Sequence, residues 1–409
     1  MRTAAFLYPW DVVGDPDAAR RLAGLGVQQV TLASSYHSTR ALTPRHPRHR
    51  IVTARHAAVL YPPDATRWAG RTLRPYPQDW VAGADPFGEA ARALADAGLE
   101  VHTWVVLAHN SRMGAEHPAI AVHNAYGDPY PWAPCIARPE VRDYLVTLAA
   151  EAAVRPGARG AELESCGWYG LAHPHAHDKT GQLPLSGAAQ YLMSLCFCPV
   201  CSAGYTGLGV PAAELRGAVV RALEPVWAGA PAAPAAPADR AGERAEIGAL
   251  LGADLAGVAH AWREGAARTL QRAAVRAVRD AAAGEFRVLL HADPAAHRCG
   301  ANAGVDPADV LAHADGVVVP CTGDDAARAD ALGPFADRPA GATVAANLTV
   351  VSGMGGRPGA LAADAAHAAS LGAGELRLYH AGLASDRDLA AVRTALGALR
   401  EPAPERAVR

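Results

Sequence analysis

Eight short apolar runs, separated by stretches rich in Ala, Leu and Arg, constrain the fold of this chain more than any other feature. The runs that we expect to form strands are residues 4–8, 28–33, 100–107, 160–165, 286–291, 316–320, 342–348 and 375–380. Strands that alternate with helices build parallel sheets from βαβ units. Eight such strands, with no GxGxxG motif after the first, predict an α/β fold of the closed (β/α)8 TIM-barrel type.

The spacing of the runs predicts one barrel domain over residues 1–409 with a large insertion. Barrels of this kind can exceed about 400 residues when their loops carry insertions. Residues 166–285 separate the fourth run from the fifth and contain a Cys-rich loop, an Ala/Pro-rich linker at 228–237 and helical stretches. We therefore expect a long helical insertion after the fourth strand.

Composition excludes several classes of partner. Hydrophobic residues make up 50% of the chain, which is enough for a large core, and the net charge of −2 gives no basic surface for nucleic acid. No run approaches the ~20 apolar residues of a membrane span, and Asp11 comes too early for a signal peptide. We expect a cytoplasmic protein with no nucleic-acid or membrane partner, and homo-oligomerisation is left open.

The ends of the predicted strands carry polar and aromatic side chains. In barrel enzymes, catalytic and binding groups lie at the C-terminal ends of the strands. Such a rim suits a hydroxyl-rich ligand, although barrel loops are often polar without binding anything. The predicted substrate contacts are Trp10, His109, Asn110, Trp168, Tyr169, His173, His291 and Asn347, and Tyr8, Tyr36, Tyr379 and His380 also follow strand ends.

Two glutamates in the fourth run are candidates for chemistry. The two-residue period of a strand puts Glu162 and Glu164 on one face, and their apolar neighbours on the face toward the helices. Buried acids are costly unless they are paired or functional. We expect the deeper Glu162 to pair with His102 or Arg377. Glu164 lies at the mouth, where a raised pKa would make it a general acid; a neutralised salt bridge is the alternative.

Asp293, at the end of the fifth run, is the candidate for the second catalytic carboxylate. Adjacent strands lie about 4.8 Å apart, so Asp293 and Glu164 are expected to flank a bound sugar. Carboxyl groups about 5 to 5.5 Å apart indicate retention of configuration, and about 6.5 to 9.5 Å indicate inversion. The sequence leaves this choice open, and a turn-forming Asp before Pro294 is the alternative role.

The segment Cys196-Phe197-Cys198-Pro199-Val200-Cys201 is the most specific motif of the chain. Three thiolates in six residues can surround one soft, tetrahedral cation, which then needs a fourth ligand from elsewhere. Buried free thiols are the alternative.

Together these features resemble the family 42 β-galactosidases and related glycoside-hydrolase-like barrels. The resemblance rests on the strand-four glutamate, on Cys-x-Cys-x-x-Cys followed by Tyr205, and on an upstream Cys-x-x-x-Pro-x-x-Arg that begins at Cys135. It covers roughly residues 100–205. It implies that Glu164 is the acid/base and that a structural zinc is held by Cys135, Cys196, Cys198 and Cys201.

The chain differs from that family at two catalytic positions. Leu163 stands before the acid where the family has Asn, and the seventh run ends in Asn347-Leu348-Thr349 without the nucleophilic glutamate. The leading hypothesis is a glycosidase that acts on a small carbohydrate through Glu164 and Asp293. The alternatives are a catalytically inactive sugar-binding barrel, and a metal-dependent hydrolase or isomerase that uses His173, His177, His291 and Asp293.

Overall fold

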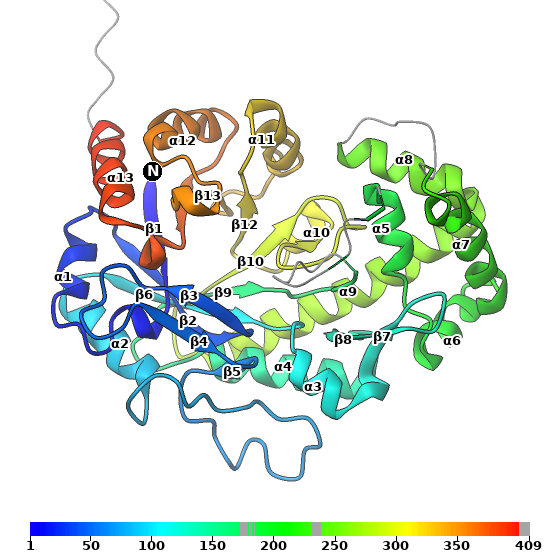
Figure 1. Cartoon of the computed structure of the whole chain (residues 1–409), viewed down its shortest axis with the longest axis horizontal. Helices are drawn as coiled ribbons and strands as arrows, with labels where there is room; N and C mark the ends of the chain where they lie inside the picture. The colour runs from blue at the N-terminus through cyan, green and yellow to red at the C-terminus, as the bar shows by residue number, and fades with distance from the viewer. Residues whose placement is uncertain (172–178, 180–181, 184, 231–238, 401–409) are drawn as a thin grey trace, which may run out of the picture.

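The eight apolar runs form the eight parallel strands of a closed barrel (Figure 1). The computed structural model describes residues 1–171, 179, 182–183, 185–230 and 239–400. Around the barrel the order is β1 (Arg2–Leu7), β2 (Gln29–Tyr36), β6 (Glu100–Val106), β9 (Gly160–Glu164), β10 (Arg287–Asp293), β12 (Gly316–Pro320), β13 (Thr343–Thr349) and β14 (Glu375–Tyr379). Because β1 pairs with both β2 and β14, the barrel closes, which confirms the predicted (β/α)8 fold.

Helices follow the strands and cover the outside of the barrel. They are α1 (Ala18–Ala23), α2 (Pro86–Asp96), α4 (Pro139–Ala153), α10 (Pro307–Leu311), α11 (Asp325–Leu332), α12 (Leu361–Ser370) and α13 (Asp386–Ala398). Several begin at side-chain caps: Asp85 accepts a hydrogen bond from the amide of Gly88, and Ser385 accepts one from that of Asp388. Such caps satisfy amides that a helix leaves free at its first turn.

The insertion after β9 is helical, as predicted. It contains α5 (Gly187–Met193), α6 (Pro199–Gly207), α7 (Ala212–Trp227), α8 (Arg240–Leu251) and the long α9 (Ala253–Ala281), which returns along α4 to the barrel. In Figure 1 these helices form the green group on one side of the barrel.

Two β-hairpins and short elements in the loops were not predicted. The connection after β2 holds the hairpin β3 (Thr39–Leu42) and β4 (Ile51–Ala54), and β5 (Ala58–Val59). The connection after β6 holds α3 (Ser111–Glu116) and the hairpin β7 (Ala121–His123) and β8 (Pro129–Pro134). The short β11 (Ala303–Gly304) pairs with the end of β10.

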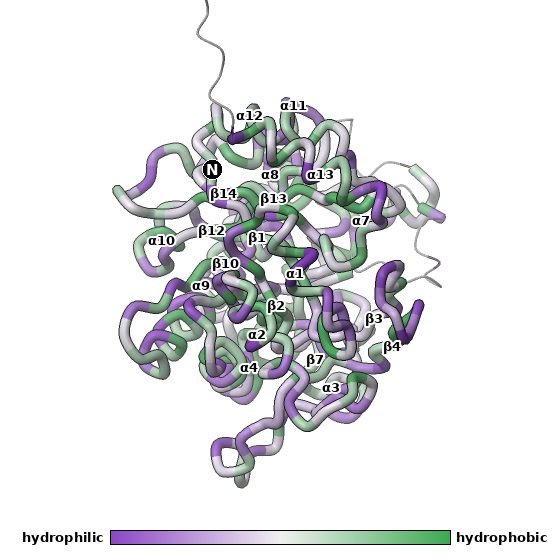
Figure 2. The backbone as a smooth tube through the Cα atoms, turned by 90° about the vertical axis from the view of Figure 1, so that its left-hand side faces the viewer, coloured by the Kyte–Doolittle hydropathy of each residue, from purple (hydrophilic) through white to green (hydrophobic). Residues whose placement is uncertain are grey.

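The apolar core has one layer between strands and helices and a second inside the barrel. In Figure 2 the strands near the centre are largely hydrophobic, whereas the peripheral loops carry much of the hydrophilic sequence. The interior is aromatic toward the C-terminal ends, where Phe6, Tyr8, Tyr36 and Trp104 pack together. Within the described part of the chain, no helix combines the length and apolar character needed to cross a bilayer.

Candidate functional site

Both glutamates of β9 point into the barrel, as the strand period predicted. Glu162 is fully buried, and its Oε1 accepts hydrogen bonds from Arg377 Nε at 2.7 Å and from Thr31 Oγ1 at 3.2 Å. Burial raises the pKa of Glu162, but the positive charge of Arg377, supported by His291, outweighs it and holds that pKa at about 2. Glu162 is therefore a paired carboxylate, and Arg377 is the partner; His102 lies instead 2.8 Å from Glu100.

Glu164, at the C-terminal end of β9, has a different environment. Its Oε2 accepts a hydrogen bond from Trp104 Nε1 at 2.8 Å and lies 3.8 Å from His291 Nδ1. No Arg or Lys nitrogen of the described residues lies within 4 Å of this carboxylate. Burial raises the pKa of Glu164, and the nearby charge of Glu162 raises it further. The charge of His291 and the hydrogen bond from Trp104 lower it, but the net shift is upward. A carboxyl group with a raised pKa at a barrel mouth has the property a general acid needs.

Three tyrosines at strand ends, Tyr8, Tyr36 and Tyr379, pack against Trp104, which donates a hydrogen bond to this acid. The ring of Tyr36 lies 4.8 Å from that of Tyr8 and 4.7 Å from that of Trp104, and the rings of Trp104 and Tyr379 are 6.0 Å apart. Burial raises the pKa of all three phenols well above the usual value, and the charge of Glu164 raises it further. The phenols therefore stay protonated and are hydrogen-bond donors beside the carboxylate.

Two residues at the same end of the barrel have left-handed backbone conformations. Ser165, which follows Glu164, has φ 57°, and His380, which follows Tyr379, has φ 61°. Such conformations cost a non-glycine residue on the order of 1 kcal/mol or more and concentrate at functional sites. The strain therefore marks the same region as the buried acid.

Some predicted substrate contacts join this aromatic region. Trp10 stacks on Tyr8 at 4.3 Å, and its indole nitrogen has no hydrogen-bond partner among the described residues. His109 stacks on Tyr169 at 4.7 Å. The Oδ1 atom of Asn347 is also buried without a partner in the described part of the chain. A polar ligand could satisfy these atoms.

Other predicted contacts have packing roles. Asn110 caps α3 by accepting a hydrogen bond from the amide of Met113 at 3.0 Å. Trp168 donates its indole N–H to the carbonyl of Arg263 at 2.9 Å, and the Arg263 guanidinium lies 4.8 Å from its ring. His173 and His177 lie outside the described residues.

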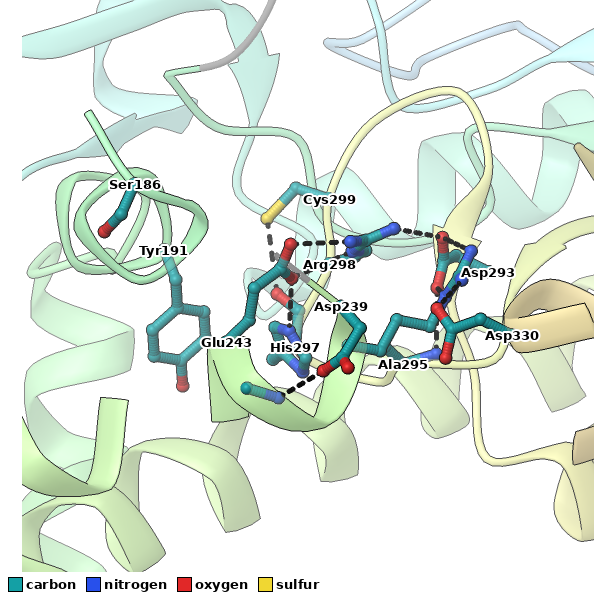
Figure 3. Close-up of polar contacts among 12 residues, drawn as sticks. Ser186, Tyr191, Asp239, Glu243, Asp293, Ala295, His297, Arg298, Cys299 and Asp330 are labelled. Atoms are coloured by element: carbon teal, nitrogen blue, oxygen red, sulfur yellow. Dashed lines mark hydrogen bonds and ion pairs between the residues drawn. The ribbon is translucent and has the colours of Figure 1, made fainter. Parts of the chain in front are cut away.

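Asp293 belongs to a row of ion pairs beside the barrel mouth (Figure 3). Its Oδ1 accepts from Arg240 Nε at 2.8 Å and from the amide of Ala295 at 2.9 Å. Its Oδ2 accepts from Arg240 at 2.9 Å and from Arg298 at 3.2 Å. Both oxygens are therefore occupied. No sequence motif indicates this pairing, because Arg240 lies in the insertion, 53 residues before Asp293.

Arg298 extends the row to Glu243, and this part of the row lines a cavity. Arg298 Nε and Nη2 lie 2.9 and 2.6 Å from the two oxygens of Glu243, which is also 2.9 Å from His297 Nε2. At the other end, Arg240 also binds Asp330. We call this set the charged wall: Asp330, Arg240, Asp293, Arg298 and Glu243. Asp293, Arg298 and Glu243 of the wall line a cavity with a volume of about 420 Å³. Its lining also includes His297, Gln190, Tyr191, Ser194, Cys299, Ala301 and Asn302.

The four cysteines predicted as metal ligands come together in one buried cluster. Their sulfur atoms all lie within 4.8 Å of one another, and Cys135 Sγ is 3.7 Å from Cys198 Sγ and 3.6 Å from Cys201 Sγ. Four sulfurs at about 2.3 Å from a tetrahedral metal are separated by about 3.8 Å. The donor set and spacing therefore fit such an ion. Elsewhere among the described residues, no group of three or more His, Cys, Asp or Glu has this arrangement.

The cysteine cluster joins two loops that flank Glu164. Cys135 follows β8, in the connection after β6, whereas Cys196, Cys198 and Cys201 lie in the insertion after β9. Hydrogen bonds run alongside it: Tyr130 donates to the carbonyl of Met193 at 2.8 Å, and Trp132 donates to that of Gly170 at 2.8 Å. The hairpin β7–β8 thus supports the segment just after Glu164.

Comparison with solved structures defines the class of fold. α-L-Fucosidase isoenzyme 2 from Paenibacillus thiaminolyticus matches with a TM-score of 0.56 and 11% identity over 97% of this chain and 49% of its own. The β-galactosidase from Rahnella sp. R3 matches with a TM-score of 0.53 and 11% identity, over 98% of this chain and 56% of its own. The β-galactosidase from Marinomonas ef1 matches with a TM-score of 0.50 and 12% identity, over 97% of this chain and 59% of its own. The chain shares the barrel fold of these three proteins and spans about half to three-fifths of their length.

Comparison by sequence identifies no closer group. No protein-family model matches the chain. No curated protein matches it either.

Proposed function

We propose that this protein is a glycoside hydrolase in which Glu164 protonates the leaving oxygen of a carbohydrate substrate. The observation that carries the proposal is the contrast between the two acids of β9. The negative charge of Glu162 is balanced by Arg377, whereas Glu164 has a raised pKa and no Arg or Lys partner among the described residues. A protonated carboxylic acid in a buried aromatic site can donate a proton to an alkoxide that forms as the glycosidic bond breaks. The tyrosines and Trp10 supply donors and flat surfaces for a sugar.

Within this proposal, Asp293 holds the substrate, and its role as second catalytic carboxylate requires a rearrangement. A nucleophile or base needs a free oxygen lone pair directed at the reacting atom. Both oxygens of Asp293 accept hydrogen bonds from guanidinium or amide groups. One of the two arginines would have to move before Asp293 could act on a sugar or a water molecule.

We further propose that the cysteine cluster holds a structural zinc ion, as in the family 42 β-galactosidases that the sequence resembles. Four thiolates leave no open position for a substrate, which is typical of structural zinc. When bound, the ion would fix the two loops beside Glu164. The donation of the proton would belong to Glu164 alone.

A second candidate function is sugar binding without catalysis. Two observations favour it: β13 ends without an acid, and Asp293 is occupied by arginines. A barrel with one unpaired acid can still bind a saccharide through its aromatic and polar rim. This candidate differs from the first in predicting no turnover.

Turnover of a panel of aryl glycosides by the wild-type chain and by Glu164→Gln separates the two. For a hydrolase, the substitution removes the proton donor, and kcat/KM falls by about 10² to 10⁴-fold. The pH profile of the wild type should decline on the basic side, because Glu164 must be protonated. Asp293→Asn, which keeps the shape of the side chain, should mainly raise KM. Absence of wild-type turnover together with saccharide binding would contradict the hydrolase and support the second candidate.

A further inference from the structure

The cavity beside the charged wall shares a backbone contact with the strand that carries the acid. The amide of Ser165, the residue after Glu164, donates a hydrogen bond to the carbonyl of Ala301 at 2.9 Å. Ala301 and Asn302 both line the cavity, as do Asp293 and Pro320 at the C-terminal ends of β10 and β12. The cavity therefore opens at the same end of the barrel as Glu164, one loop away from it.

We infer that this cavity is a carbohydrate subsite, which holds a neutral sugar unit next to the bond that Glu164 would cleave. This inference rests on the proposed function and adds a substrate class to it. The substrate would be an uncharged saccharide of at least two units. One unit would lie in the aromatic region around Glu164, and the next in the cavity.

The charges of the wall argue for a neutral ligand. Asp293 lies between Arg240 and Arg298, and Glu243 binds Arg298 through both oxygens. An anionic ligand would be repelled by the carboxylates of Asp293 and Glu243. A cationic ligand would be repelled by the guanidinium group of Arg298, and both carboxylates are already paired with arginines. A ligand with hydroxyl groups can donate to Glu243 Oε1, which accepts one hydrogen bond from Arg298, and can accept from the remaining N–H groups without adding a charge.

The rest of the lining has the composition of a site for a small polar molecule. The Oδ1 atom of Asn302 is buried and has no hydrogen-bond partner in the described part of the chain. Gln190 adds a second amide, and Tyr191 adds an aromatic ring. Sites for small molecules have volumes of about 300 to 1,000 Å³ and combine apolar surface with a few placed polar groups. The cavity of about 420 Å³ falls within that range.

Cys299 provides a reporter for occupancy of this cavity that does not depend on catalysis. It lines the cavity and is partly exposed, whereas the other six cysteines of the chain are buried. Its sulfur lies 2.8 Å from Arg263 Nη2. Alkylating reagents reach a partly exposed thiol more readily than a buried one. Iodoacetamide should therefore label Cys299 first, and a bound sugar should shield it.

The test measures the rate of Cys299 alkylation in the Glu164→Gln chain, which binds without turnover. The probes are lactose, cellobiose and maltose, with sodium phosphate as the anion, and peptide mass spectrometry reads the labelled position. At least one disaccharide, present at ten times its dissociation constant, should slow the labelling about tenfold, as mass action requires. Phosphate should leave the rate unchanged. Cys299→Ser identifies the reporter peptide, and Asn302→Ala should reduce the protection, measured against the labelling rate of the same variant without sugar.

The outcomes separate this inference from the proposed function. Protection by phosphate alone, or by none of the probes, overturns the carbohydrate subsite. If the wild-type chain hydrolyses these disaccharides while they leave Cys299 unprotected, the hydrolase stands and the subsite fails. If they protect Cys299 but the wild type hydrolyses no glycoside, the subsite stands and the hydrolase fails.

Discussion

Glu162 and Glu164 stand two residues apart on one strand, yet the barrel stabilises opposite protonation states in them. Arg377 keeps Glu162 charged and its pKa near 2. Burial raises the pKa of Glu164, so the folded protein favours its neutral form. The cause is geometric: only the deeper carboxylate reaches the guanidinium from β14. One strand thus carries a structural ion and a candidate proton donor.

This contrast predicts opposite effects of matched substitutions on stability. Glu162→Gln breaks the fully buried ion pair with Arg377 and leaves that guanidinium with Glu375 alone, which should destabilise the fold by about 3 kcal/mol. Glu164→Gln removes a carboxylate that is costly to ionise, so near neutral pH it should leave stability unchanged or raise it. Urea unfolding of the two variants and the wild type checks this. Equal destabilisation by both would contradict the electrostatic assignment.

At the level of elements, the hairpin β7–β8 and the helix α6 meet at the cysteine cluster. Cys198 is the N-terminal cap residue of α6, and Cys201 lies in its first turns. Phe197 donates its amide to the carbonyl of His123 at 2.7 Å, so the two elements are joined by backbone as well as by sulfur. An ion at this point would tie the insertion to the barrel.

Loss of one cluster thiol should therefore remove the metal and loosen this junction. We expect the purified chain to carry one equivalent of zinc, and Cys201→Ser to carry much less and to melt at a lower temperature, since metal binding is coupled to folding. Cys166→Ser is the matched control, because Cys166 is equally buried and lies outside the cluster. Elemental analysis and thermal melts give the readout. Metal-free wild-type protein that melts like a zinc-loaded sample would refute the site.

At the scale of the whole molecule, ion pairs inside the barrel determine how the stability of the fold responds to acid. Arg377 joins Glu162 to Glu375, and Arg287 joins Glu375 from β10. The folded pKa of Glu162, about 2, lies below its ordinary value of 4.5. Its stabilising contribution is therefore complete above pH 4.5 and is lost as the pH falls toward 2.

The wild-type chain should lose about 3 kcal/mol of stability from Glu162 alone between these pH values. Unfolding free energies measured by urea titration from pH 5 to pH 2.5 check the expectation. The Glu162→Gln variant lacks this group, so its stability should decline less over the same range. A decline of equal size in both chains would assign the acid sensitivity to other carboxylates.

The barrel could be predicted from the sequence because each of its strands is indicated by a short local run of apolar residues. Each strand is buried on both faces, so it appears as a short apolar run, and the period of two assigned Glu162 and Glu164 to the interior. The four cysteines were also predictable, three from local spacing and Cys135 from the resemblance. The hairpins were missed because β3, β4 and β7 are short and partly exposed.

The pairing of Asp293 could not be read from the sequence. Arg240 follows the Ala/Pro-rich linker, so its position depends on how the insertion folds back over the barrel. The same holds for Glu243, one turn further along α8. Trp104 was missed for another reason: it lies inside an apolar run, where its role as donor to Glu164 looks like ordinary core packing.

The cysteine cluster draws its sulfurs from two connections that only become neighbours when β6 and β9 pair. The four thiols can therefore act together on one ion only when these two connections have been brought side by side. A chain without the proposed ion would lack this link between the two loops beside Glu164.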